Sequence, residues 1–192
     1  RQLKAVNLES DITVATSLQQ VEAIRNQLDQ KVSIVVEPER RDTFPAIALS
    51  VAYLYFEKNC LPNETIIVLP VDPYVDDEYF QMLHRMNTIV QEEKAELVLM
   101  GAIPTYPSEK YGYIIPKEEG LQWEREYNTK DFKNKIFQVS KFKEKPDVCT
   151  AREFIASGGL WNCGVFAFKL SYIMEIVHSI IKCSCYMDIL NQ

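Results

Sequence analysis

Charged and amide side chains that could bind a ligand gather in one segment, FKEKPDVCTAREFIASGGLWNCGVFAFK, at residues 142–169. Glu144 and Lys145 are an adjacent acid and base, Pro146 follows them, and Asn162 comes after a Gly-Gly turn. A carboxylate and an amide can bind hydroxyl groups, and an ammonium group can pair with a phosphate. The segment could therefore bind a phosphorylated, hydroxyl-bearing ligand, or it could be a solvated strand end beside a satisfied core amide.

Three lysines precede Pro146 at a spacing of two residues. An extended strand would project Lys141, Lys143 and Lys145 to one face and Glu144 to the other. The lysines could meet a phosphate or form a solvated strand face. Glu144 and Lys145 can reach one pocket only if the strand ends or twists at Pro146.

Two other polar groups follow strand-like runs, where parallel α/β sheets bind ligands. Asp72 closes the apolar run at 65–72, and it could hold a hard cation such as Mg²⁺ or serve as a turn or helix-cap residue. The segment 37–45 reads EPERRDTFP and could contact an anion or a nucleotide at a helix N-terminus. It could equally be a solvated helix start capped by Asp42 or Thr43.

Continuous apolar runs alternate with helical patterns through the first half of the chain. The expected strands are 11–16, 32–38, 65–72 and 95–104, and the expected helices are 17–29, 45–58 and 77–93. This alternation predicts an α/β fold with a parallel sheet covered on both faces. Shorter strand-like runs at 111–116, 137–145 and 164–169 predict a more antiparallel second half.

Length and composition predict one globular domain over residues 1–192. The net charge of −6 argues against non-specific binding to nucleic acid or to an anionic membrane. No run approaches the about 18 apolar residues of a membrane span. Five cysteines without C-x-x-C spacing indicate reduced thiols in a cytoplasmic protein. The residues alone therefore predict an α/β domain that binds an anionic small molecule, and they assign no role to His84 or His178.

Five motifs, taken in order, resemble the nucleotidyltransferase domain of the mannose-1-phosphate guanylyltransferases, a branch of the sugar-nucleotide pyrophosphorylases. They are EPERRDTFPAIALS, VLPVDPYV, LVLMGAIPTYPSEKYGYI, FKEKPD and GGLWNCGVFAFK. The resemblance extends from about Asp11 to Lys169. It implies a Rossmann-like, three-layer α/β domain with a mixed, mostly parallel central sheet.

The resemblance also implies roles for single residues of the sugar-phosphate site. Asp72 would be catalytic and would hold Mg²⁺. Gly112 would let the backbone approach the sugar. Glu144 and Asn162 would bind sugar hydroxyls, and Lys145 would be a catalytic residue that pairs with the sugar phosphate.

For the nucleotide, the resemblance implies contacts from the loop and helix start that contain Glu37, Arg41, Thr43 and Pro45. Two positions depart from the family pattern. Many relatives read R-N-T where this chain has Arg41-Asp42-Thr43, so a contact made by that amide is in doubt. The pair DP at 72–73 replaces the more usual DH.

The reaction implied is formation of GDP-mannose and pyrophosphate from GTP and mannose 1-phosphate, with Mg²⁺ as cofactor. A homodimer is compatible with the family. The family's glycine-rich loop would precede Arg1 and a second metal-binding Asp would follow Gln192, so we expect a partial enzyme that catalyses poorly as written. The alternatives are a non-catalytic, sugar-nucleotide-binding regulatory subunit and a related pyrophosphorylase for another nucleoside triphosphate or hexose 1-phosphate.

Overall fold

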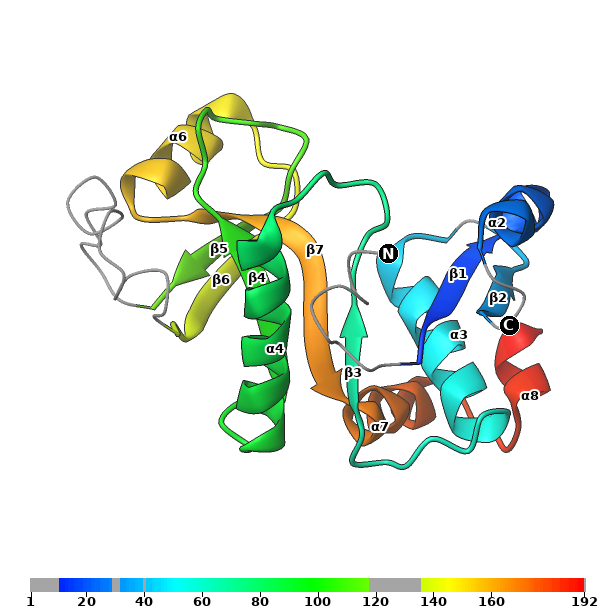
Figure 1. Cartoon of the computed structure of the whole chain (residues 1–192). Coiled ribbons are helices and arrows are strands. Elements are labelled where there is room, and N and C mark those ends of the chain that lie inside the picture. The colour runs from blue at the N-terminus through cyan, green and yellow to red at the C-terminus, as the bar shows by residue number, and fades with distance from the viewer. Residues whose placement is uncertain (1–10, 29–31, 40, 118–135, 192) are drawn as a thin grey trace. The chain divides into compact units, whose positions relative to one another are not determined.

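Figure 1 shows the computed structural model of the chain, which describes residues 11–28, 32–39, 41–117 and 136–191. The chain divides into two units. Unit 1 contains residues 1–98 and 166–192, and unit 2 contains residues 99–165. The long strand β7 (Leu160–Lys169) begins in unit 2 and ends in unit 1. The single domain predicted over residues 1–192 stays a prediction.

Unit 1 begins with a parallel strand pair. Its first elements are β1 (Thr13–Ser17), a 3₁₀ turn η1 (Leu18–Gln20), α2 (Val21–Gln27), β2 (Ser33–Glu37) and α3 (Thr43–Phe56). Strand β1 pairs in parallel with β2, and Thr13 lies opposite Ser33. A parallel pair needs a crossover connection, which η1 and α2 supply.

The rest of unit 1 follows α3 in the chain. It contains β3 (Thr65–Val68), α4 (Asp77–Gln91), the end of β7, α7 (Leu170–Ile180) and α8 (Tyr186–Leu190). Strand β3 pairs antiparallel with β7, and Thr65 lies opposite Lys169. The apolar face of α3 packs against α7 and α8. Fully buried side chains such as Val51 and Leu170 form this core.

Unit 2 contains most of β4 (Leu97–Ala102), together with β5 (Tyr113–Pro116), β6 (Val139–Lys143), α6 (Val148–Ala156) and the first part of β7. Strand β5 lies between β7 and β6 and runs antiparallel to both. Helix α6 packs on β5, where Tyr113, Ala151 and Phe154 form a small core. The strands and the helix together hold the segments on which the candidate site is built.

The predicted α/β class with a mixed sheet is confirmed, and so is the antiparallel character of the second half. Among the described strands, β1 and β2 pair in parallel. Strand β7 instead runs antiparallel to both β3 and β5. Helix α3 also begins two residues before Pro45, which the first turn tolerates because its N–H groups have no intrahelical partner.

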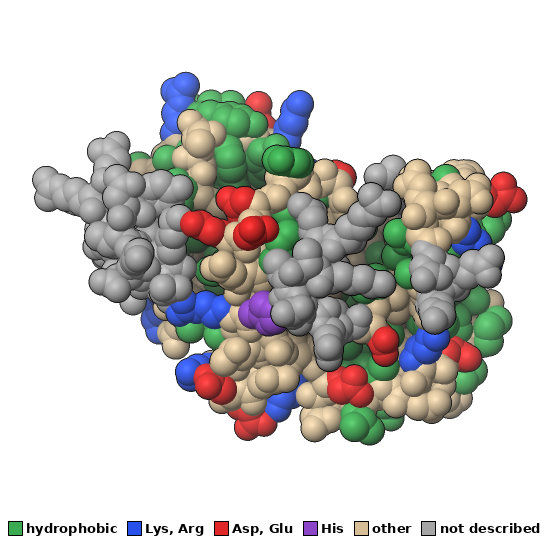
Figure 2. Space-filling view, viewed as in Figure 1, with side chains coloured by type: hydrophobic (Ala, Val, Ile, Leu, Met, Phe, Trp, Pro, Cys, Tyr) green, Lys and Arg blue, Asp and Glu red, His purple; other side chains and the backbone are tan. Residues whose placement is uncertain are grey.

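All five cysteines fall within the described residues, and all of them are unpaired. This confirms the predicted free thiols. In the described part of the chain, no helix is both long and apolar enough to cross a membrane. On the face shown in Figure 2, the described acidic and basic side chains are interspersed. The described side chains on this face therefore form no field of one charge.

Candidate functional site

The segment that follows β6 has the backbone break that the sequence required. Strand β6 ends at Lys143, and Lys145 has a positive φ of 42°. Alternation would direct Glu144 and Lys145 to opposite faces. The left-handed backbone at Lys145 reverses this, and its Nζ lies 3.5 Å from Glu144 Oε1. The break thus falls at residues 144–145, just before Pro146, and it brings both charges together.

Gly112, which immediately precedes β5, lies directly beneath the Glu144 carboxylate. A Cβ atom at residue 112 would be 2.6 Å from Glu144 Oε2 and 2.9 Å from Phe142 Cζ. Any larger residue would therefore force these two side chains to move. Gly112 itself is buried, and its carbonyl accepts a hydrogen bond of 2.8 Å from the backbone N–H of Asn162. We call Gly112, Glu144, Lys145 and Asn162 the Gly112 cradle.

Asn162 adjoins Gly112 through its backbone, and its side-chain oxygen accepts a hydrogen bond within β7. Its Oδ1 accepts a hydrogen bond of 3.1 Å from the N–H of Gly164, which has a φ of 68°. The amide nitrogen Nδ2 carries two donor N–H groups, and an N–H group of this kind can donate to a ligand oxygen. Burial raises the pKa of the neighbouring Cys163 to about 11, so its thiol is no nucleophile at neutral pH.

A buried hydrogen-bond network stabilises the start of β5 beside the cradle. The Tyr113 hydroxyl accepts hydrogen bonds from Trp161 Nε1 at 3.0 Å and from the Ser108 N–H at 2.9 Å. Tyr113 is fully buried. The rings of Tyr106 and Tyr111 each lie 5.1 Å from the Trp161 ring. These contacts hold Gly112 and Asn162 in register.

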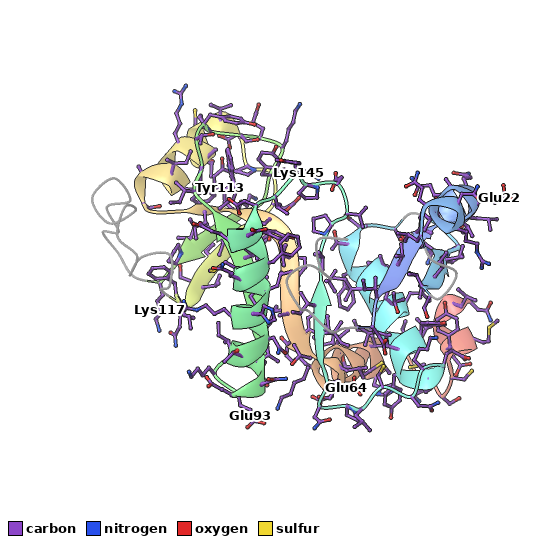
Figure 3. All side chains as sticks on the ribbon, in the orientation of Figure 1. Glu22, Glu64, Glu93, Tyr113, Lys117 and Lys145 are labelled. Atoms are coloured by element: carbon purple, nitrogen blue, oxygen red, sulfur yellow. The ribbon has the colours of Figure 1, made fainter. Side chains whose placement is uncertain are left out.

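Helix α6 begins at Val148, directly after the cradle. Asp147 caps the helix, because its carboxylate accepts hydrogen bonds from the Thr150 N–H at 2.9 Å and from the Thr150 hydroxyl at 2.8 Å. These hydrogen bonds hold the pKa of Asp147 below its usual value. Figure 3 shows Lys145 on the connection that leads into this helix. Glu144 and Lys145 thus lie between two fixed points, the end of β6 and the start of α6.

The lysines predicted to share one face are divided between two environments. Lys141 Nζ lies 5.3 Å from the centre of the Phe154 ring, on the α6 side of β6. Lys145 turns toward Glu144 instead. Lys141 and Lys145 thus have different partners, and Lys145 is the lysine whose ammonium group lies beside Glu144.

Asp72 lies in unit 1, on the exposed segment between β3 and α4. It does not cap α4, because Asp76 does so by accepting a hydrogen bond of 3.2 Å from the Tyr79 N–H. Within the described residues, no group of three or more His, Cys, Asp or Glu side chains could hold a metal ion. A single exposed carboxylate still suits Mg²⁺, which keeps several waters and takes its other ligands from substrate phosphates.

The predicted nucleotide residues also lie in unit 1, around the start of α3. Glu37, Arg41 and Pro45 line one cavity of about 520 Å³, whereas Thr43 is not among its lining residues. The other lining side chains are mostly apolar and come from α3, α7 and α8. Arg41 forms an ion pair with Glu39 at 3.0 Å.

Asp42 is the cap of α3. Its carboxylate accepts a hydrogen bond of 3.2 Å from the Thr43 N–H. The sequence offered a helix start capped by Asp42 or Thr43 as the alternative to a nucleotide contact, and the Asp42 cap is present. It does not exclude a nucleotide contact by the residues around it.

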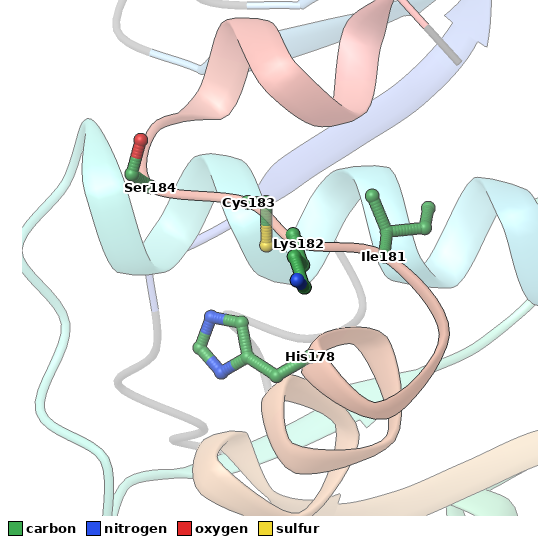
Figure 4. Close-up of a pocket in the computed structure, with 5 residues that line it drawn as sticks. All are labelled: His178, Ile181, Lys182, Cys183 and Ser184. Atoms are coloured by element: carbon green, nitrogen blue, oxygen red, sulfur yellow. The ribbon is translucent and has the colours of Figure 1, made fainter.

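A second cavity lies at the end of α7, where Figure 4 shows His178, Ile181, Lys182, Cys183 and Ser184 around it. It measures about 350 Å³. Burial raises the pKa of the Cys183 thiol, which favours the unreactive, protonated form. The Ser184 hydroxyl, which also lines this cavity, donates a hydrogen bond of 3.0 Å to the Asp188 carboxylate. The sequence assigned His178 no role, and that stays a prediction.

The fold is α/β, and its Gly112 cradle places a carboxylate, an ammonium group and an asparagine next to a buried glycine. The chain belongs to the nucleotidyl transferase family, whose family model matches residues 4–182.

Curated relatives support this family. The chain is 36% identical over 143 residues to the alginate biosynthesis protein AlgA of Pseudomonas fluorescens, covering 74% of this chain and 27% of the relative. It is 30% identical over 174 residues to mannose-1-phosphate guanylyltransferase 2 of Escherichia coli O157:H7, covering 90% of this chain and 34% of the relative. The chain thus spans between a quarter and just over a third of the length of these two relatives.

Solved structures share the fold. The crystal structure described as a mannose-1-phosphate geranyltransferase from Thermus thermophilus matches with a TM-score of 0.72 and 25% identity, over 99% of this chain and 55% of that protein. A mannose-6-phosphate isomerase from Helicobacter pylori matches with a TM-score of 0.67 over 92% of this chain and 63% of that protein. The latter is 22% identical and supports the fold alone.

Proposed function

We propose that this protein transfers a guanylyl group from GTP to mannose 1-phosphate and releases pyrophosphate. Membership of the nucleotidyl transferase family supports the reaction type. Relatives named mannose-1-phosphate guanylyltransferase support the choice of substrates. The observation that carries the proposal is the Gly112 cradle, in which the Glu144 carboxylate lies over Gly112, Lys145 Nζ lies beside that carboxylate, and Asn162 pairs with Gly112 through the backbone.

In the proposed reaction, the sugar phosphate supplies its own nucleophile. A phosphate oxygen of mannose 1-phosphate attacks the α-phosphorus of GTP, the bond from that phosphorus to the β-phosphate oxygen breaks, and pyrophosphate leaves with the bonding electrons. The attacking oxygen is already anionic, so no general base is required. Catalysis of this kind depends on positioning and on neutralising charge.

Each cradle residue has a role in this scheme. Lys145 pairs with the phosphate of mannose 1-phosphate and holds it in place. Glu144 accepts hydrogen bonds from sugar hydroxyls, while the Asn162 amide donates to a sugar oxygen. Gly112 leaves the space that the Glu144 carboxylate occupies. In the free protein, Glu144 is the ionic partner of Lys145, so the arriving phosphate competes with the Glu144 carboxylate for the ammonium group.

The proposal extends to unit 1. Asp72 would hold Mg²⁺, which when bound neutralises negative charge on the phosphate oxygens. Glu37, Arg41 and Pro45 would contact the nucleotide from the cavity that they line, and Thr43 would contact it from the first turn of α3.

A substrate panel on the whole protein tests the proposal. Pyrophosphate release is measured for each nucleoside triphosphate combined with each hexose 1-phosphate, for the unmodified protein and for Lys145→Ala and Lys145→Arg. We expect the fastest turnover with GTP and mannose 1-phosphate, a loss of at least about 100-fold in kcat/KM for Lys145→Ala, and a smaller loss for Lys145→Arg, which keeps the charge.

Other outcomes separate the rival functions. Equal or faster turnover of another substrate pair would favour a related pyrophosphorylase. Binding of GDP-mannose without turnover of any pair would favour a non-catalytic regulatory subunit. Either result would overturn the guanylyltransferase assignment.

A further inference from the structure

Phe142 is a large apolar side chain that the fold leaves 45% exposed. It lies on β6, and its ring contacts the site that a side chain at Gly112 would fill, with Cζ at 2.9 Å and Cε2 at 3.4 Å from the Cβ position. Exposed aromatic surface loses the free energy that burial would give it. The sequence motifs indicated a role for Glu144 but not for Phe142. The two residues are nevertheless two positions apart, which is the spacing that places side chains on the same face of a strand.

Phe142 and Glu144 lie on the same side of β6 and its continuation, because they are two residues apart. Both reach Gly112, where the Phe142 ring and the Glu144 carboxylate approach the same point to within 3 Å. Lys145 Nζ lies beside that carboxylate. The cradle therefore presents an aromatic ring, a carboxylate and an ammonium group next to one another.

A hexose phosphate carries three matching groups. The carbon-bound hydrogens of a pyranose ring form an apolar face, hydroxyls extend from its edge, and the phosphate is anionic. An apolar face packs on an aromatic ring, hydroxyls donate to a carboxylate, and a phosphate pairs with an ammonium group. We propose that Phe142 binds the pyranose ring of the sugar phosphate and thereby positions its hydroxyls on Glu144. This inference rests on the proposed function.

Alanine substitution tests the inference, and the same strand supplies a matched control. Val139 is also on β6 and is 47% exposed, but it lies opposite Pro116, away from Gly112. In the whole protein, Phe142→Ala, Phe142→Leu and Val139→Ala are compared with the unmodified chain. The measurements are the Kd for mannose 1-phosphate by titration calorimetry, and the KM values for mannose 1-phosphate and GTP.

We expect Phe142→Ala to raise the Kd and KM for mannose 1-phosphate about tenfold, with the KM for GTP changed less than about twofold. Phe142→Leu keeps much of the apolar surface, so its Kd and KM for mannose 1-phosphate should rise about threefold or less. Val139→Ala should match the unmodified protein. A purely structural role for Phe142 would instead lower the thermal midpoint and alter both KM values together.

Three results would overturn the inference. The first is a Phe142→Ala variant whose Kd for mannose 1-phosphate stays within about twofold of the unmodified protein's value, while both proteins turn the substrates over. The proposed function would survive that result. The second is a Val139→Ala variant that loses as much affinity for mannose 1-phosphate as Phe142→Ala does. That result would also leave the proposed function intact. The third is an unmodified protein that binds no hexose phosphate, which would remove the proposed function as well.

Discussion

The carboxylate of Glu144 occupies the space that the absence of a side chain at Gly112 leaves open. Its Oε2 atom lies 2.6 Å from the position of a Cβ at residue 112, closer than a real Cβ tolerates. The contact joins two segments that lie more than thirty residues apart in the sequence. The position of the Glu144 carboxylate in the cradle therefore depends on the identity of residue 112.

Gly112→Ala should displace Glu144 without unfolding unit 2. The colliding atoms are the ends of the Glu144 and Phe142 side chains, which can rotate away. We expect kcat/KM for mannose 1-phosphate to fall at least about tenfold, while the thermal midpoint falls only a few degrees. In a Glu144→Ala background, Gly112→Ala should lower kcat/KM less than it does in the unmodified protein, because the carboxylate that it would displace is already absent. An equal loss in both backgrounds would show that Gly112 acts independently of Glu144.

Tyr113→Phe should destabilise the fold beside the cradle. Removing the hydroxyl leaves the Trp161 Nε1–H and the Ser108 N–H without their acceptor. An unsatisfied buried donor costs about 1–3 kcal/mol, so we expect the free energy of unfolding to fall by about 2–3 kcal/mol in urea titrations. Tyr74→Phe is the matched control, since Tyr74 is fully exposed and should be neutral. Equal stability of the two variants would contradict a stabilising role for the Tyr113 hydroxyl.

Asp42→Gly should stabilise unit 1. Asp42 has φ 76° and ψ −176°, a backbone region that is essentially restricted to glycine. Relief of this strain should exceed the few tenths of a kcal/mol lost with the cap, for a net gain of about 1 kcal/mol. Asp76→Gly is the control, because Asp76 caps α4 with an ordinary φ of −92° and should lose stability. A loss of stability in both variants would mean that Asp42 stores no strain.

The cap of α6 should make stability depend on pH. Hydrogen bonds from the Thr150 N–H and hydroxyl lower the folded-state pKa of Asp147 below its ordinary value of 3.8. A lowered pKa contributes stability that is present above the unfolded-state value and is lost as the pH falls through the folded-state value. From about pH 5 downward, the thermal midpoint should therefore fall more steeply in the unmodified chain than in Asp147→Asn. Parallel curves for the two proteins would rule out this contribution.

Much of the local structure follows from short-range patterns. The apolar runs at 32–38 and 95–104 became β2 and β4, because a short continuous apolar run favours a buried strand. The stripe at 77–93 became α4, because a 3.6-residue period buries one face of a helix. The motif order also indicated the family that the family model matched. The extent of antiparallel pairing through β7 was less predictable, because strand neighbours depend on contacts far apart in the sequence.

The sequence by itself determined which chemical groups this protein can present: the adjacent acid and base at 144–145, the amide at Asn162, and the glycine at residue 112. Only the tertiary structure decided where those groups lie. The left-handed backbone at Lys145 places its ammonium group beside Glu144, against the alternation of a strand. The antiparallel pairing of β5 and β7 places Asn162 beside Gly112. Residue types are local, whereas a cradle requires contacts between distant segments, and those form only when the sheet is assembled.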